Sequence, residues 1–139
     1  MNSKEQKMRY TELNNKLEQR KNSSLISERY PNVEEIKIEM LLDYPNTFSE
    51  HKREDSKIFK PNDKAYFEID CINRDCVFSN LSLDSEVFSA IYQKLESYKD
   101  RKICHGYNTF SCYERKSGTC MTNLDYEIKI TYKNANGDR

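Results

Sequence analysis

Apolar and polar residues alternate along three segments of the chain, and a period of two is typical of a strand with one buried and one solvent-facing side. The segments are residues 32–45, 64–71 and 124–133, and Pro45 ends the first of them. We therefore expect three strands. The polar stretch between the first two, residues 46–63, is expected to be a long loop or the frayed tip of a hairpin.

A different spacing marks residues 81–102, whose apolar residues recur at intervals of three and four. This is the period of a helix with one buried face. We expect Ser82 or Asp84 to cap its N-terminus. Three basic residues are expected at its C-terminus, where the helix dipole favours cations: Lys99, Arg101 and Lys102. The segment therefore predicts one long helix packed on the apolar side of the sheet.

The first part of the chain, residues 1–28, is polar and rich in charged residues. Met8, Leu13 and Leu17 give it only a thin apolar stripe, and basic residues outnumber acidic ones over its first 24 positions. We expect a solvated, partly helical arm, because a short isolated helix is marginal in water. The alternatives are a helix that docks on a partner protein and a helix through which two copies dimerise.

Residues 29–133 are expected to form the folded domain, and residues 134–139 a disordered tail. A hairpin is expected in residues 107–119, with its turn at "RKSG". The order of arm, strand, loop, strand, cysteine knuckle, helix, hairpin and strand predicts an α+β fold. In this fold a small antiparallel or mixed sheet carries one helix on its apolar side, with a zinc knuckle and an N-terminal helical arm.

The composition limits what such a domain can do. The chain has 139 residues, of which 36% are hydrophobic and 33% charged, so its core is lean for its length. Its 23 basic and 23 acidic residues balance, which excludes an overall basic field for nucleic acid but allows a local patch. With three glycines, it offers no glycine-rich loop for phosphate.

The sequence also bears on the compartment. No run of about 18 apolar residues is present, and the N-terminus lacks an apolar signal segment. We expect a cytoplasmic protein with no membrane partner. Thiols stay reduced in the cytosol, so its cysteines indicate metal binding before they indicate disulfides.

Five cysteines carry the candidate chemistry: Cys71, Cys76, Cys104, Cys112 and Cys120. Cys71 and Cys76 form a C-x4-C pair, a spacing at which proteins supply two ligands to a tetrahedral zinc. The second pair is expected from Cys104 and Cys120. Gly106 lets the backbone turn beneath a metal after Cys104, and Cys120 precedes the last strand. Four thiols leave no open coordination position, so we expect structural rather than catalytic Zn²⁺.

Other ligand sets and other uses of the thiols stay open. Cys112 can replace Cys120, or His105 can replace one of the thiols. Buried cysteines without metal are a further alternative, and so is a redox or disulfide pair, although the C-x-x-C spacing of redox motifs is missing. A cysteine–histidine nucleophile is not indicated, because no orienting carboxylate accompanies Cys104 and His105.

A local basic cluster indicates a second class of function. Basic residues with tyrosines nearby can hold single-stranded nucleic acid by phosphate contact and base stacking. The candidate contacts are Arg74, Lys99, Arg101, Lys102, Arg115 and Lys116. The alternative is an ordinary solubilising surface.

Several stretches together carry a resemblance to a known class of domain. They are "FEIDCINRDC", a helix, "CHGY" and a last cysteine before "LDYEIKITYK". Over residues 65–133 the chain resembles zinc-ribbon-like domains and is similar to small uncharacterised bacterial proteins with a C-x-N-R-x-C knuckle. The resemblance implies structural zinc on Cys71, Cys76, Cys104 and Cys120, and it assigns no activity.

These observations predict a non-enzymatic, zinc-stabilised protein-interaction module. Its partner is expected to be another protein, with the basic arm as a docking element or as a dimerisation helix. The alternative is a nucleic-acid-binding accessory protein that uses the knuckle and the basic patch.

Overall fold

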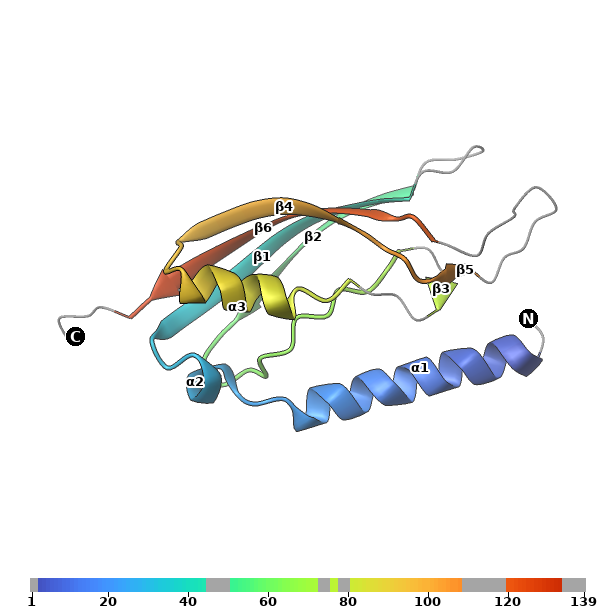
Figure 1. The fold of residues 1–139 in the computed structure, drawn as a ribbon, viewed down its shortest axis with the longest axis horizontal. Coiled ribbons are helices and arrows are strands. Elements are labelled where there is room, and N and C mark those ends of the chain that lie inside the picture. Colours follow the sequence, from blue (N-terminus) through green and yellow to red (C-terminus); the bar gives the residue numbers. More distant parts are fainter. Residues whose placement is uncertain (1–2, 45–50, 73–75, 78–80, 109–119, 134–139) are drawn as a thin grey trace.

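The structure, a computed structural model, describes residues 3–44, 51–72, 76–77, 81–108 and 120–133. In this part of the chain, a four-stranded antiparallel sheet has the order β2-β1-β6-β4, and two short strands pair beside it (Figure 1). The predicted α+β fold is confirmed. Along the chain the elements are α1 (Ser3–Asn22), α2 (Ile26–Arg29), β1 (Val33–Tyr44), β2 (His51–Phe59), β3 (Cys76–Val77), α3 (Asp84–Tyr92), β4 (Ser97–Ile103), β5 (Tyr107–Asn108) and β6 (Asn123–Tyr132).

The first and last alternating segments form the central strands β1 and β6, as predicted. Their register places apolar residues opposite one another on the buried face, including Ile38 opposite Ile128 and Leu42 opposite Leu124. Cross-strand pairs of this kind stabilise a sheet and fix its register, because a slip by one residue would turn every buried side chain to solvent.

Strand β2 corrects the prediction of a long loop within residues 46–63, and its antiparallel pairing with β1 is closer to the alternative of a hairpin. His51–Phe59 pairs with β1 along its whole length, from Tyr44 opposite His51 to Ile36 opposite Phe59. β2 is an edge strand of this sheet. Edge strands often carry charged residues, which discourage pairing with other chains, so this strand lacks the alternation by which a half-buried strand is recognised.

The predicted strand over residues 64–71 is wrong in type, although its alternation correctly marks the buried side. Ala65, Phe67 and Ile69 are buried, yet the segment makes only isolated bridges, Lys64 with Leu25 and Glu68 with Ser82. It runs extended beneath the sheet and exchanges backbone hydrogen bonds with the segment before α3: Ile69 N donates to Leu81 O, and Leu83 N donates to Phe67 O.

The helix predicted over residues 81–102 ends early, at Tyr92. Lys94 has a positive φ of 60°. Its amide donates to Ile91 O, and the amide of Leu95 donates to Ala90 O. This pair of bonds around a left-handed residue is the Schellman motif, which terminates helices and usually has glycine in the left-handed position. The residue before the helix is Leu83, without a side-chain cap, so the predicted caps Ser82 and Asp84 are wrong.

Residues after this turn form strand β4 instead of the helix C-terminus. Lys99, Arg101 and Lys102 therefore lie in a strand that pairs with β6. The lysines and arginine that were expected to complement a helix dipole are the polar residues of an edge strand.

The core lies between the inner face of the sheet and a layer made of α2, α3 and the extended segment at residues 65–72. Ile26, within the predicted arm, is fully buried there. Helix α1 forms the N-terminal arm on the far side of this layer from the sheet (Figure 1). In the described part of the chain, no helix is long and apolar enough to cross a membrane. Most of the expected hairpin over residues 107–119 and the whole expected tail lie outside the described residues.

Candidate metal centre

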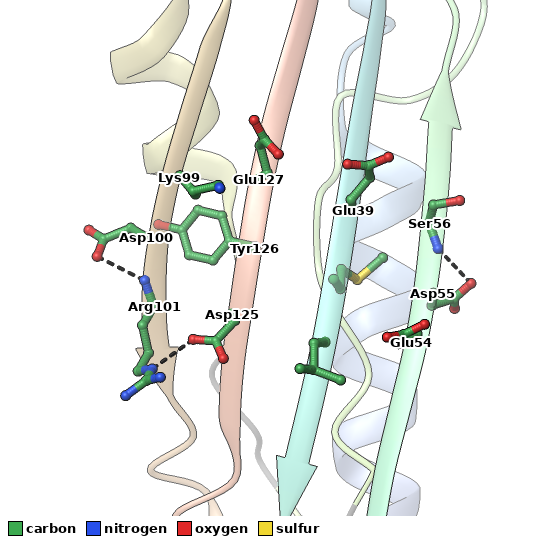
Figure 2. A pocket seen from close by; sticks show the side chains of 12 residues that line it. Glu39, Glu54, Asp55, Ser56, Lys99, Asp100, Arg101, Asp125, Tyr126 and Glu127 are labelled. Atoms are coloured by element: carbon green, nitrogen blue, oxygen red, sulfur yellow. Dashed lines mark hydrogen bonds and ion pairs between the residues drawn. The ribbon is translucent and has the colours of Figure 1, made fainter.

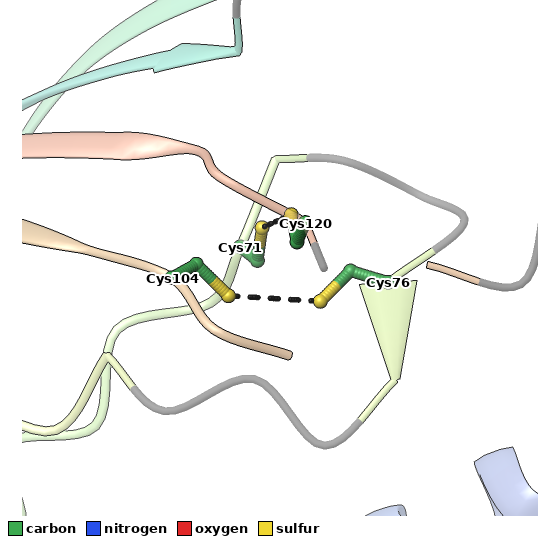
Figure 3. A group of neighbouring side chains, drawn as sticks. All are labelled: Cys71, Cys76, Cys104 and Cys120. Atoms are coloured by element: carbon green, nitrogen blue, oxygen red, sulfur yellow. Dashed lines mark hydrogen bonds between the residues drawn. The ribbon is translucent and has the colours of Figure 1, made fainter. Parts of the chain in front are cut away.

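Four thiols from four separate places in the chain meet at one end of the sheet. Cys71 ends the extended segment, Cys76 begins β3, Cys104 follows β4, and Cys120 lies shortly before β6. Figure 3 shows their sulfur atoms pointing toward one another. The fold therefore brings together the four residues that the sequence predicted to share a site.

The sulfur positions suit a tetrahedral ion. The sulfurs of Cys71 and Cys120 are 3.5 Å apart, those of Cys76 and Cys104 are 3.7 Å apart, and all four lie within 4.8 Å of one another. Zinc–sulfur bonds of about 2.3 Å in a tetrahedron place neighbouring sulfurs about 3.8 Å apart. All four cysteines are free, since a disulfide would require a sulfur–sulfur distance of about 2.0 Å.

Backbone hydrogen bonds hold two of the ligand positions together by continuing the ladder between β4 and β6. Cys104 N donates to Thr122 O at 2.8 Å, and Met121 N donates to Cys104 O at 2.9 Å. Cys120 N donates to Gly106 O at 2.9 Å. Met121, at a positive φ of 69°, makes the turn between Cys120 and Thr122. A non-glycine residue in this region costs free energy, which the surrounding hydrogen bonds must supply.

The other two ligand positions come from less regular backbone. Cys76 lies in β3, opposite Asn108 of β5 in a two-residue pair of strands. Cys71 lies near the end of the extended segment, between buried Ile69 and Ile72, which fix its place against the core. The two pairs in contact are Cys71 with Cys120 and Cys76 with Cys104, so each contact joins a residue before α3 to one after it.

Polar groups around the sulfurs complete the site. The hydroxyl oxygen of Thr122 lies 3.3 Å from the Cys71 sulfur and 3.2 Å from the Cys120 sulfur. Thr122 is the buried polar residue of the described core. The amide of Gly106 donates to the Cys104 sulfur at 3.4 Å. Groups of this kind orient metal-bound thiolates and disperse their charge. Thr122 was not among the site residues predicted from the sequence, and its position two residues after Cys120 is the signal that marks it.

The sulfurs strongly influence one another's pKa. Hydrogen bonding with Cys104, then with Cys120 and Cys71, raises the pKa of Cys76. Hydrogen bonding with Cys104, then with Cys71 and Cys76, lowers the pKa of Cys120. The pKa of Cys104 is lowered to about 7, since Cys120 raises it but Cys71, Cys76 and the Gly106 amide lower it. Sulfurs this close cannot all be charged unless a cation balances them, so the cluster suits a divalent ion.

The donor set fits a metal with a preference for sulfur. Three of the four cysteines are buried, and Cys71 is partly buried. The metal-ligating group found in the described part of the chain consists of these four thiols without His105, which is exposed beside Cys104. Four thiolates at tetrahedral spacing bind Zn²⁺ and also fit iron, whereas Mg²⁺ and Ca²⁺ require oxygen ligands. The four cysteines could therefore hold a metal ion. The rival ligand Cys112 lies outside the described residues.

The predicted nucleic-acid contacts are divided between two faces of the sheet. Arg101 faces the open side, where its Nε donates to Asp125 Oδ1 at 2.7 Å (Figure 2). Lys99 lies on the same side, opposite Glu127 of β6. Lys102 points to the other side, where it donates to Glu86 and to Ser82 O. The remaining candidates lie outside the described residues: Arg74, Arg115 and Lys116.

The open face of the sheet is hollowed and mixed in charge. Its lining includes Glu39, Glu54, Asp125 and Glu127 beside the two cations Lys99 and Arg101 (Figure 2). Acidic side chains in the centre of this hollow would repel phosphate. Lys99 and Arg101 therefore lie among carboxylates on this face.

No known protein family, curated protein or solved structure matches the chain. The four-cysteine cluster is compatible with a zinc-binding domain.

Proposed function

We propose that the chain is a non-enzymatic, zinc-stabilised module that binds another protein. The observation that carries this proposal is the cluster of four thiols, with sulfur contacts of 3.5 Å and 3.7 Å. Four sulfur ligands fill the coordination shell of zinc and leave no position for a water molecule or substrate, so the ion is structural. It ties the extended segment and β3 to the ends of β4 and β6.

A small, lean domain benefits from such an ion. Structural zinc contributes on the order of 10 kcal/mol of apparent free energy at neutral pH, which is comparable to the whole stability of a typical domain. The ligands Cys71 and Cys76 come from segments with little regular backbone pairing: Cys71 lies outside any strand, and β3 pairs with β5 over two residues. Zinc therefore fixes a part of the fold that its own backbone pairing holds weakly.

Exposed apolar side chains support the binding of a protein partner. Phe88 and Tyr92 are 50% and 79% exposed on α3 and stack on each other, with ring centroids 6.2 Å apart. A second group of exposed apolar side chains lies on α1 and consists of Tyr10, Leu13 and Leu17. Large exposed apolar residues that cluster on a surface are typical of protein-interaction sites. Nucleic-acid binding is the competing proposal. It is less favoured because Arg101 and Lys102 are already paired with the carboxylates of Asp125 and Glu86.

Metal content tests the first part of the proposal. Elemental analysis of the purified full-length chain should give about one zinc per chain. Cys76→Ser should lose zinc and unfold cooperatively at a much lower temperature, whereas Cys112→Ser should retain both zinc and stability. Visible absorption separates iron from zinc, since iron thiolates are coloured and zinc thiolates are not. A zinc-free wild type, or an unchanged melting temperature in Cys76→Ser, would overturn the proposal.

Position-resolved cross-linking tests the second part. A photo-crosslinking amino acid at Tyr92 should capture a protein in cells, and the same group at Glu54 on the open sheet face should not. Titration with single-stranded DNA and RNA oligomers tests the competing function. Salt-dependent binding that is lost in Arg101→Glu and Lys102→Glu would replace the protein partner by nucleic acid.

A further inference from the structure

Helix α1 contacts the rest of the domain through polar residues. Lys16 Nζ lies 3.5 Å from Glu68 Oε2 and 3.2 Å from Glu12 on its own helix. Tyr66 donates its hydroxyl hydrogen to Gln19 Oε1 at 3.4 Å. Glu12, Lys16 and Gln19 follow one another at intervals of four and three residues, so they share one helix face. The face of α1 that is turned to the domain is therefore polar.

The end of the helix is fixed in the same way. Lys64 Nζ donates to the carbonyl oxygens of Lys21 at 3.1 Å and Ser23 at 2.9 Å. These bonds place a cation at the helix C-terminus, where the dipole favours it. They also set how α1 is rotated relative to the domain, since Lys64 belongs to the segment that leads into the core.

Three apolar residues of α1 whose side chains are described point away from the domain. Tyr10, Leu13 and Leu17 are 69%, 56% and 56% exposed. At 3.6 residues per turn, they lie on one face that is rotated by roughly 120° from the polar, domain-facing side. A surface helix normally turns its apolar face to the core. Here the arrangement is the opposite, and three anchors at positions i, i+3 and i+7 are presented to solvent.

Basic residues border this apolar stripe on both sides. Arg20 lies along one edge, and Lys7 and Lys21 lie along the other, and all three are exposed. The acidic residue Glu12 is turned toward the domain and paired with Lys16. Exposed Glu18 lies roughly 100° around the helix from the centre of the stripe, about 20° beyond Lys7 on the same flank. With three exposed cations and this one carboxylate, the rims of the stripe carry a net positive charge.

The charge pattern decides which partner fits. A second copy of α1, packed in either direction, would bring like charges together along both rims, which is unfavourable. A membrane surface requires a larger apolar face than two leucines and a tyrosine provide. An amphipathic helix with apolar residues on one face and carboxylates on its flanks complements both the stripe and its rims.

We propose that the outward face of α1, formed by Tyr10, Leu13 and Leu17 between basic rims, is the docking surface for an acidic amphipathic helix of a partner protein. The proposal rests on the interaction role argued above and specifies its partner class. Tyr10, Leu13 and Leu17 occupy consecutive core positions of a heptad repeat (a, d and a). Lys7 and Lys21 occupy flanking e positions, which would face glutamates of the partner.

A synthetic helix tests this surface on the zinc-loaded full-length chain. The probe is a three-heptad peptide with leucine at its core positions and glutamate at its flanking positions, and the matched peptide carries lysine in place of glutamate. Calorimetric titration should show binding of the acidic peptide alone. Leu13→Ala with Leu17→Ala should weaken it by about tenfold or more. Lys7→Glu with Lys21→Glu should weaken it and favour the basic peptide. The control Ile58→Ala alters a similarly exposed apolar side chain on β2 and should leave the affinity unchanged.

Four outcomes would overturn the proposal. They are no binding of the acidic peptide, equal binding of both peptides, dimerisation in sedimentation that Leu13→Ala abolishes, and binding of phosphatidylserine vesicles that depends on the same residue. Because the altered side chains are exposed, zinc content and melting temperature should match the wild type in every α1 variant. A failed peptide titration with intact zinc content therefore rejects the docking surface alone, while a failure of the zinc test rejects the structural role of the metal.

Discussion

The hydroxyl oxygen of Thr122 lies 3.2 Å from the sulfur of Cys120, inside the protein and out of contact with water. The same oxygen lies 3.3 Å from the sulfur of Cys71. A hydroxyl has one hydrogen to donate, and a metal-bound thiolate accepts it well. Thr122 therefore supports two predicted ligands without being one.

Replacement of this hydroxyl should weaken metal binding without removing a ligand. Thr122→Val keeps the shape of the side chain and deletes the donor, so the zinc affinity should fall by roughly 10- to 100-fold, as for other groups that support metal ligands. Competition with a chromophoric chelator measures this affinity. Thr122→Ser retains the hydroxyl and should stay close to the wild type. Equal affinities in the valine and serine variants would show that the hydroxyl contributes nothing to the site.

Removal of the metal should cost most of the stability of the domain. Structural zinc supplies on the order of 10 kcal/mol, and a domain of this size has about 5–15 kcal/mol in total. Treatment with excess EDTA should therefore abolish the cooperative thermal transition seen by circular dichroism. Added Zn²⁺ should restore it, and added Mg²⁺ should not, because Mg²⁺ prefers oxygen ligands. Retention of the transition after complete metal removal would contradict this prediction.

The sequence predicts the elements in which burial follows a regular period. β1 and β6 alternate because one face of each packs on the core, and their apolar residues meet in register, as Ile36 does with Ile130. The segment around Phe67 alternates for the same reason, yet it runs beneath the sheet rather than within it. Alternation reports that one side is buried, and it does not report which backbone supplies the hydrogen bonds.

The sequence does not predict the elements whose structure depends on backbone geometry or on a position at the edge of the sheet. β2 is mostly charged from Lys52 to Lys57, because its pairing with β1 needs only backbone groups. The turn that ends α3 has Lys94 in the left-handed position, where glycine would usually signal a helix end in the sequence. The grouping of the four cysteines could be predicted from the C-x4-C pair and from the chemistry of zinc, whereas Thr122 could not, since a lone threonine near a cysteine is common.

The turn after α3 offers a direct test of backbone strain. Lys94 adopts a φ of 60°, a left-handed conformation that is unfavourable for residues with a Cβ atom. Lys94→Gly should therefore stabilise the protein by roughly 0.5–1 kcal/mol, even though glycine is also more flexible in the unfolded chain. Urea unfolding measures the difference. Lys94→Ala removes the charged side chain but keeps the Cβ atom, so it should be close to the wild type. If both variants changed stability equally, loss of the lysine side chain and not its φ would be the cause.

The attachment of α1 should depend on pH through one buried carboxylate. Glu68 Oε2 is buried, receives no hydrogen bond from the described residues, and lies 3.5 Å from Lys16 Nζ. Burial raises the pKa of Glu68, and the nearby Lys16 ammonium offsets only part of this effect. Since the folded-state pKa lies above the unfolded-state value, the contribution of Glu68 to stability is full below the unfolded-state pKa. It is lost as the pH rises through the folded-state pKa.

Glu68→Gln removes this titration while keeping the size of the side chain. The variant should gain stability relative to the wild type between about pH 3.5 and about pH 7, the range in which a glutamate with a raised pKa loses its proton. Chemical denaturation at both pH values measures the change. With Glu68 present, Lys16→Met should increase the loss of folding stability as the pH rises, because it removes the cation that partly offsets burial of the carboxylate. In the Glu68→Gln background, Lys16→Met should have no such pH-dependent effect. A Glu68→Gln variant that is less stable than the wild type at about pH 7 would show that the ion pair outweighs the cost of burial.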